Sequence, residues 1–231
     1  MSLPIVLVPG LLATPRMYAD QIAQLWQFGP VTVANHTREE SVAAIARRIL
    51  ADAPPQFALV GLSMGGYISL EIMRQAASRV ARLGLLDTSA RPDAPEQSEG
   101  RRALIALARS GRFGEIADML YPRLVDKSRL NDSALRQLVR VMAHEVGPDA
   151  FVRQQTAIIG RPDSRSGLGA IRCPTLVLVG EGDVLTPPEL ASELAAGIPT
   201  ARLVKVPGSG HLSTLEQPAA VSKALIELLQ G

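Results

Sequence analysis

Residues 57–66 read Phe-Ala-Leu-Val-Gly-Leu-Ser-Met-Gly-Gly, an apolar run that leads into a serine placed between glycines. The run has the composition of a buried parallel strand, and a helical pattern begins near Gly66. In so tight a strand-to-helix turn, Gly61 and Gly65 lie against neighbouring backbone, where a Cβ atom would collide. We therefore predict a strained Ser63 whose hydroxyl points away from the sheet, ready to attack a carbonyl. Taken alone, the motif also fits a glycine-rich turn with a serine cap.

A nucleophilic serine requires a base, and the chain has three histidines. His211 lies in a glycine-rich loop directly after the strand-like run 201–206. The carboxyl ends of parallel strands are where active sites of open α/β sheets gather, so His211 is the predicted base. His144 lies in a helical stretch and His36 follows a short strand. Both are predicted to be surface or packing residues.

The histidine in turn needs an orienting acid. The clear buried strand at 174–179 is followed by Gly-Glu-Gly and then by Asp183, which is the predicted acid. The competing candidate is Asp87, at the end of the strand-like run 83–86. The order serine, acid, histidine along the chain favours Asp183.

The tetrahedral intermediate of acyl transfer needs N–H donors for its oxyanion. The backbone N–H of Met64, in the serine turn itself, is one predicted donor. The second is predicted to be the N–H of Leu11, in the loop after the first strand. The side chains of Leu11, Leu12 and Met64 would then line an apolar mouth around the serine.

Three motifs, 61–66, 180–183 and 208–211, together resemble the α/β-hydrolase superfamily over nearly the whole chain, in the family's order. Within it the chain is similar to the small, lidded esterase and lactonase branch. That resemblance implies hydrolysis of a carboxylic ester or lactone with a modest, largely apolar acyl group, and no cofactor or metal. The chain departs from many relatives at Pro9-Gly10, where they carry His-Gly. It also opens on the strand 3–8, which implies that the family's first two strands are absent.

Strand and helix patterns alternate along most of the chain, which predicts parallel βαβ crossovers. The predicted fold class is α/β, with a doubly wound, mainly parallel sheet of about six strands and a helical cap insertion. The core is predicted to comprise 1–90 and 168–231. The intervening 91–167 contains no convincing strand but four helical stretches, namely 99–110, 113–120, 131–146 and 148–159.

An insertion between two core strands on the active-site side is predicted to form a cap, or lid, that excludes water and shapes the substrate pocket. Apolar side chains of this cap and of the first loop are predicted to contact the substrate. They are Leu12, Met119, Leu120, Met142 and Phe151. Methionines at helical spacing also fit simple core packing.

Composition narrows the class of protein further. The 231 residues carry a formal net charge of only +2, so no nucleic-acid partner is indicated. The single cysteine, Cys173, excludes an internal disulfide and does not support a metal cluster. The run 3–8 is too short to span a membrane and lacks the features of a signal peptide. We expect a cytoplasmic enzyme with a small-molecule substrate.

The predicted activity is therefore that of a serine hydrolase working through an acyl-enzyme. Two other classes stay open. The same three side chains also serve carbon–carbon bond hydrolysis, thioester hydrolysis or acyl transfer to an acceptor other than water. A non-catalytic module that captures a small ligand and signals to a partner would keep the fold without turnover.

Overall fold

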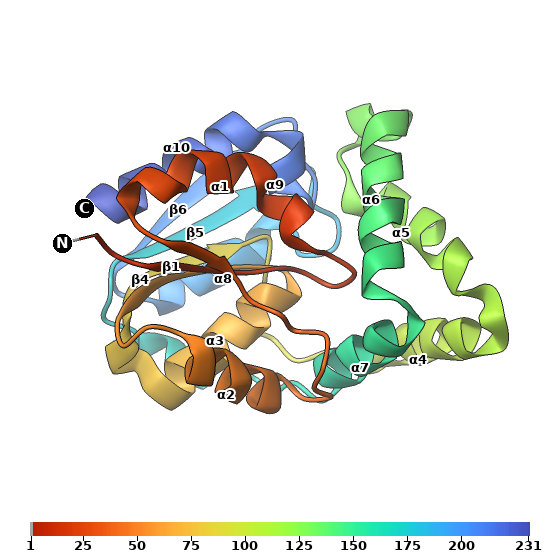
Figure 1. Ribbon diagram of the computed structural model, residues 1–231, viewed down its shortest axis with the longest axis horizontal. Helices are drawn as coiled ribbons and strands as arrows, with labels where there is room; N and C mark the ends of the chain where they lie inside the picture. The colour runs from red at the N-terminus through yellow and green to blue at the C-terminus, as the bar shows by residue number, and fades with distance from the viewer. Residues whose placement is uncertain (1) are drawn as a thin grey trace.

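A computed structural model describes residues 2–231, and its centre is a six-stranded parallel sheet (Figure 1). The strand order is β2-β1-β3-β4-β5-β6, and every neighbouring pair is parallel. The strands are β1 (Ile5–Val8), β2 (Val31–Val33), β3 (Phe57–Leu62), β4 (Val80–Leu86), β5 (Thr175–Gly180) and β6 (Ala201–Val206). The predicted α/β fold with about six parallel strands is confirmed.

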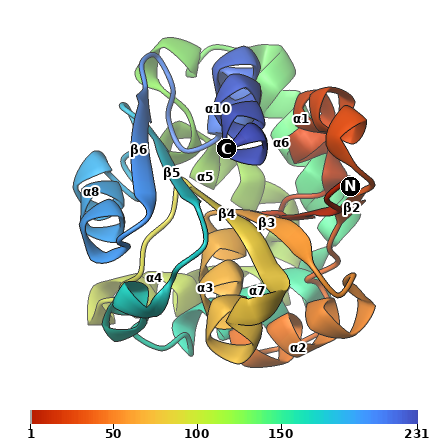
Figure 2. The ribbon, with the colours of Figure 1, turned by 90° about the vertical axis from the view of Figure 1, so that its left-hand side faces the viewer.

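Helices cover both faces of this sheet (Figure 2). One face is covered by α1 (Ala19–Leu25) and α10 (Pro218–Gln230), and the other by α2 (Val42–Asp52), α3 (Met64–Ala76) and α8 (Pro188–Gly197). The central strands β1, β3 and β5 are buried along their whole length. Their nearly continuous apolar sequences follow from this double coverage.

The strand order reverses at β1, which lies between β2 and β3. Loops that leave β1 and β3 at such a point diverge, which opens a crevice beyond the carboxyl ends of the strands. Here those loops carry Gly10–Leu12 and Ser63. The topology therefore places the candidate nucleophile at the position where open α/β sheets bind ligands.

The chain between β4 and β5 forms α4 (Pro95–Leu107), α5 (Ile116–Leu124), α6 (Ser133–Val146) and α7 (Pro148–Ile159). We call 91–167 the helical segment. Figure 1 shows these four helices beyond the carboxyl ends of the strands. The bounds of α4 and α5 differ from the sequence prediction, which gives 99–110 and 113–120. The start of α4 lies four residues earlier than predicted. Pro95 occupies the first turn, and Gln97 Oε1 accepts the Ala94 N–H at 2.9 Å, so a proline-rich stretch starts the helix.

The two connections of the helical segment to the sheet are tied to each other. Ser164 N–H donates to the carbonyl of Ala90 at 2.9 Å. The nearly inaccessible carboxylate of Asp93 accepts from Arg101 at 2.8 Å and from Arg161 at 2.5 Å. The connection from β4 into the helical segment and the connection from it to β5 are therefore held together at one place.

The short helix α9 (Ser213–Glu216), which has no sequence prediction, follows the His211 loop. Throughout residues 2–231, no helix combines the length and the apolar character needed to cross a bilayer.

Candidate active site

Ser63 lies at the turn between β3 and α3, with φ 55° and ψ −116°. This backbone conformation is rare for a residue with a side chain, and it turns the hydroxyl away from the sheet. A Cβ atom on Gly61 would collide with the carbonyl of Gly65, and one on Gly65 with the carbonyl of Val8. The glycines are therefore required by close backbone approach, as the sequence predicts.

Three side chains from distant parts of the chain form one hydrogen-bonded line. His211 Nε2 lies 2.8 Å from Ser63 Oγ, and His211 Nδ1 lies 2.7 Å from Asp183 Oδ2. His211 is only 4% exposed and Asp183 only 2%. A carboxylate can only accept, so Nδ1 carries a proton and Nε2 is free to accept from the serine.

Local hydrogen bonds hold Asp183 in this position. Its Oδ1 accepts the N–H groups of Leu185 at 2.8 Å and Thr186 at 3.0 Å, and its Oδ2 accepts the Thr186 hydroxyl at 2.7 Å. Burial raises the pKa of Asp183. The charge of His211 and its hydrogen bond, together with the donors of Thr186, lower this pKa by more than burial raises it, so the net shift is downward. The carboxyl is thus held in its charged form.

The pKa of His211 is raised above its ordinary value of 6.5. Burial by itself lowers this pKa, since it disfavours the imidazolium. The charge of Asp183 and its hydrogen bond outweigh the burial. A positive charge that develops on the imidazole is therefore stabilised within the site.

Asp87, the competing acid, makes different contacts. Its Oδ1 accepts the Gly180 N–H at 2.9 Å, and its Oδ2 accepts the Ser213 hydroxyl. The shortest hydrogen bonds of the His211 ring go to Asp183 and Ser63, and none of those found in the described part of the chain goes to Asp87. Burial, and then the nearby charge of Asp183, raise the pKa of Asp87 to about 8. The side chain therefore braces two loops, and the direct contact with the histidine belongs to Asp183.

Both predicted oxyanion donors lie beside the serine. Met64 is the first residue of α3, and the first N–H groups of a helix have no acceptor within the helix. Leu11 N–H finds no acceptor in the part of the chain that the structure describes. Gly10 is so close that a Cβ atom on it would lie 3.4 Å from Ser63 Cβ. By contrast, Leu12 N–H donates to Gln154 Oε1 at 3.2 Å.

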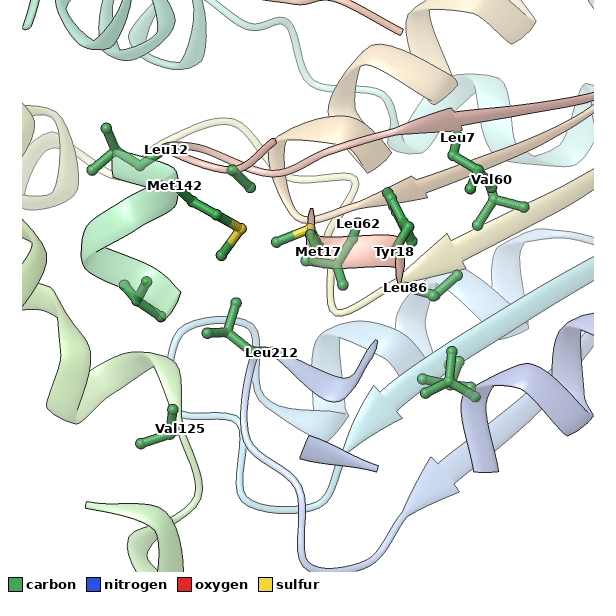
Figure 3. Close-up of a cluster of buried hydrophobic side chains, with 14 of the residues drawn as sticks. Leu7, Leu12, Met17, Tyr18, Val60, Leu62, Leu86, Val125, Met142 and Leu212 are labelled. Atoms are coloured by element: carbon green, nitrogen blue, oxygen red, sulfur yellow. The ribbon is translucent and has the colours of Figure 1, made fainter. Parts of the chain in front are cut away.

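The five side chains predicted to contact substrate have different environments. Leu12 and Met142 are buried in the cluster shown in Figure 3, and Phe151 is fully buried against the ring of Phe113. Leu120 is half-buried. Met119 is 55% exposed on α5, which argues against contact with a buried substrate.

Two apolar residues near the site have no sequence prediction. Leu212 and Val125 are both buried in the cluster that holds Leu12 and Met142. In Figure 3, Leu212 points toward Met142, and Val125 lies nearby on the helical segment. Leu212 directly follows His211 in the sequence, so its position next to the predicted base could have identified it as a residue near the site. Val125 gives no such signal, because it follows a helix far from the motifs.

Groups of three or more His, Cys, Asp or Glu side chains suited to a metal ion are absent from residues 2–231.

Several known proteins are similar to this chain over most of its length. A thermophilic esterase from Thermogutta terrifontis has 33% identical residues and a TM-score of 0.89, over 99% of this chain and 89% of that one. An enol-lactonase from Burkholderia xenovorans LB400 shares the fold, with a TM-score of 0.90, 24% identity, and coverage of 100% of this chain and 92% of its own. The pimeloyl-[acyl-carrier protein] methyl ester esterase of Yersinia enterocolitica is 26% identical over 82% of this chain and 76% of its own length. The model of the alpha/beta hydrolase family matches residues 5–224, and the chain therefore belongs to the alpha/beta hydrolase family.

Proposed function

We propose that this α/β hydrolase is a serine esterase or lactonase that cleaves a small, largely apolar acyl substrate through an acyl-enzyme intermediate. One observation carries the proposal: the unbroken line from Ser63 Oγ through His211 to Asp183, with contacts of 2.8 and 2.7 Å. Nucleophile, base and orienting acid in hydrogen-bond contact are the requirement for nucleophilic acyl transfer. Esterases among the relatives favour an ester-type substrate.

In the acylation step, Ser63 Oγ attacks the carbonyl carbon while His211 Nε2 accepts the serine proton. Asp183 holds the imidazole in the Nδ1–H tautomer and stabilises its positive charge. The N–H groups of Met64 and Leu11 donate to the oxyanion, and each such donor contributes about a hundredfold to a thousandfold in kcat. The intermediate collapses, the carbon–oxygen bond to the alcohol breaks, and His211 returns the proton to the departing alkoxide.

In deacylation, a water molecule gives its proton to His211 and attacks the acyl-serine. Collapse of this second intermediate releases the carboxylic acid, and Ser63 Oγ recovers its proton from His211. Each step uses the same base and the same oxyanion donors.

The helical segment acts as a cap in this proposal. Its apolar residues Val125, Met142 and Phe151 are buried in the same cluster as Leu12 of the oxyanion loop. Such a surface suits an apolar acyl group and keeps bulk water from the acyl-enzyme. The helical segment is therefore the element that selects the acyl chain.

Burst kinetics with a short-chain p-nitrophenyl ester test the proposal. A covalent intermediate predicts a rapid release of nitrophenol that matches the enzyme concentration, followed by slower turnover. Ser63→Ala should abolish both phases. Ser222→Ala is the matched control, because Ser222 is buried on α10 and its hydroxyl has no partner among residues 2–231. Undiminished ester hydrolysis by Ser63→Ala would contradict the proposal.

A further inference from the structure

The loop that carries Leu11 is held by a histidine outside the predicted catalytic set. Ala13 N–H donates to the carbonyl of Gly10 at 3.3 Å, which closes a tight turn over 10–13. The same carbonyl oxygen lies 2.9 Å from Nε2 of His36. His36 follows β2, the neighbour of β1 in the sheet, and is only 2% exposed.

This contact also fixes the N–H of the next residue. The carbonyl of Gly10 and the N–H of Leu11 belong to one planar, trans peptide unit, in which they point in opposite directions. A donor that holds the carbonyl therefore sets the direction of the N–H on the other side of the plane. Leu11 N–H has no acceptor within residues 2–231, and Gly10 lies against Ser63. The hydrogen bond from His36 thus acts on the predicted oxyanion donor through rigid covalent geometry.

Gln154 completes the support from the helical segment. It lies on α7 with its side chain fully buried, and its Oε1 accepts Leu12 N–H at 3.2 Å. Its Nε2 lies 3.1 Å from Nε2 of His36. When His36 Nε2 carries the proton, both nitrogens are donors, so this is a packing contact and not a hydrogen bond. The next residue back, Arg153, donates from Nε to the carbonyl of Thr37 at 2.9 Å. The helical segment is therefore joined to the His36 loop and to the oxyanion loop at one place.

The protonation state of His36 suits this role. A carbonyl oxygen can only accept, so the contact with Gly10 requires a proton on Nε2. Burial lowers the pKa of His36 to about 4, although the hydrogen bond to Gly10 partly opposes the shift. The ring is therefore neutral near pH 7. A neutral buried ring with its one proton directed at a backbone carbonyl is a fixed donor, unlike His211, whose charge must change during turnover.

We propose that His36 is a positioning residue that aims the Leu11 N–H at the oxyanion by holding the Gly10 carbonyl, while Gln154 holds the N–H of Leu12. The inference rests on the proposed acyl-transfer function, since it assigns a role within that reaction. It implies that loss of His36 weakens binding of the transition state more than binding of the ground-state ester.

Three variants test this role. His36→Leu removes the donor, and His36→Gln keeps one, because the amide nitrogen of glutamine reaches a similar distance. His144→Leu is the control, since His144 lies on the exposed face of α6. We expect His36→Leu to lower kcat by about tenfold to a hundredfold, since misdirection costs less than removal of an oxyanion donor. KM should change less than about twofold. The inhibition constant of an alkyl boronic acid, which forms a tetrahedral adduct with the serine, should rise by the same factor as kcat falls. His36→Gln should restore most of the loss, and His144→Leu should behave as the unaltered protein.

The outcomes separate this inference from the proposed function. If Ser63→Ala abolishes turnover while His36→Leu keeps kcat and boronic acid affinity within about twofold, the positioning role is wrong and the acyl-transfer function stands. If Ser63→Ala keeps full turnover, the proposed function itself fails. Equal losses in His36→Leu and His36→Gln would also overturn the positioning role.

A second measurement remains available if His36→Leu does not fold. Nitrogen-15 NMR of the unaltered protein reports which ring nitrogen of His36 carries the proton. The proposal requires the Nε2–H tautomer at pH 7. An Nδ1–H tautomer would let Nε2 accept from Gln154 and would leave the Gly10 carbonyl without this donor, which overturns the inference.

Discussion

The Glu216 carboxylate accepts hydrogen bonds from the backbone N–H groups on both sides of His211. Its Oε1 accepts the N–H of Gly210 at 2.9 Å and of Leu212 at 3.2 Å, the residues that flank the histidine. Its Oε2 accepts the N–H of Asp126 at 2.7 Å, just past the end of α5. One buried carboxylate thus connects the base's loop to the helical segment. Burial raises the pKa of Glu216, and its three backbone donors oppose that shift.

Glu216→Ala should lower the free energy of unfolding by about 2–4 kcal/mol, because it leaves the N–H groups of Gly210 and Asp126 without an acceptor, whereas Leu212 N–H keeps the Leu124 carbonyl at 3.1 Å. Urea unfolding measures this change. The control is Glu99→Ala, since Glu99 is exposed on α4 and its loss should stay within about 0.5 kcal/mol. Equal stability of the two variants would show that the Glu216 carboxylate does not hold the loop.

The two carboxylates near the histidine should differ sharply in their effect on turnover. Asp183→Asn keeps the shape but cannot hold the charged imidazole, so kcat should fall by about ten-thousandfold, as in other triads. Asp87→Asn removes a group that contacts Gly180 and Ser213 but not the histidine. Its kcat should fall by less than about tenfold. Steady-state kinetics on a p-nitrophenyl ester compare them, and a larger loss in Asp87→Asn would reverse the assignment of the acid.

The acid side of the pH profile should report His211. The base must be neutral, so kcat/KM rises as pH increases through its pKa and falls below it. Because Asp183 raises that pKa, the midpoint should lie above pH 6.5. In Asp183→Asn the main cause of the increase is gone while burial remains, so the pKa of His211 should drop below 6.5. Proton NMR titration of the ring measures both values. A midpoint below 6.5 in the unaltered protein would contradict the assigned ion pair.

The strained serine turn depends on one glycine in particular. In Gly65→Ala the added Cβ meets the Val8 carbonyl, which belongs to a central strand and cannot move away. We expect a loss of at least about 2 kcal/mol of stability, together with displacement of Ser63. Gly100→Ala is the matched control, because its Cβ would enter open space in the middle of α4. That variant should gain about 0.5–1 kcal/mol. Thermal unfolding distinguishes the two.

Much of this architecture could be predicted because it depends on local patterns. The strand that precedes Ser63 and the helix after it follow from an apolar run and a glycine-rich turn, and β3 begins at Phe57, where that run begins. The order serine, acid, histidine along the chain was enough to predict that His211 is the base for Ser63. These features need only short stretches of sequence and the rule that parallel strands present their carboxyl ends at one edge.

What the sequence could not supply depends on contacts between distant residues. His36 was predicted to be a surface or packing histidine, and its hydrogen bond to Gly10 exists only because β1 and β2 are neighbours. Gln154 reads as a polar residue of an amphipathic helix, yet it is fully buried against the oxyanion loop. Asp87 and Asp183 both end strands, and only side-chain geometry tells which one meets the base.

The covalent fate of Ser63 tests the central claim most directly. The protein is treated with a fluorophosphonate, and the adduct is located by mass spectrometry of peptides, with Ser63→Ala treated in parallel. The account predicts one phosphonyl group per molecule on Ser63 and none on the variant, with labelling strongly slowed in Asp183→Asn. An unlabelled Ser63, or the same adduct on Ser63→Ala, would contradict it.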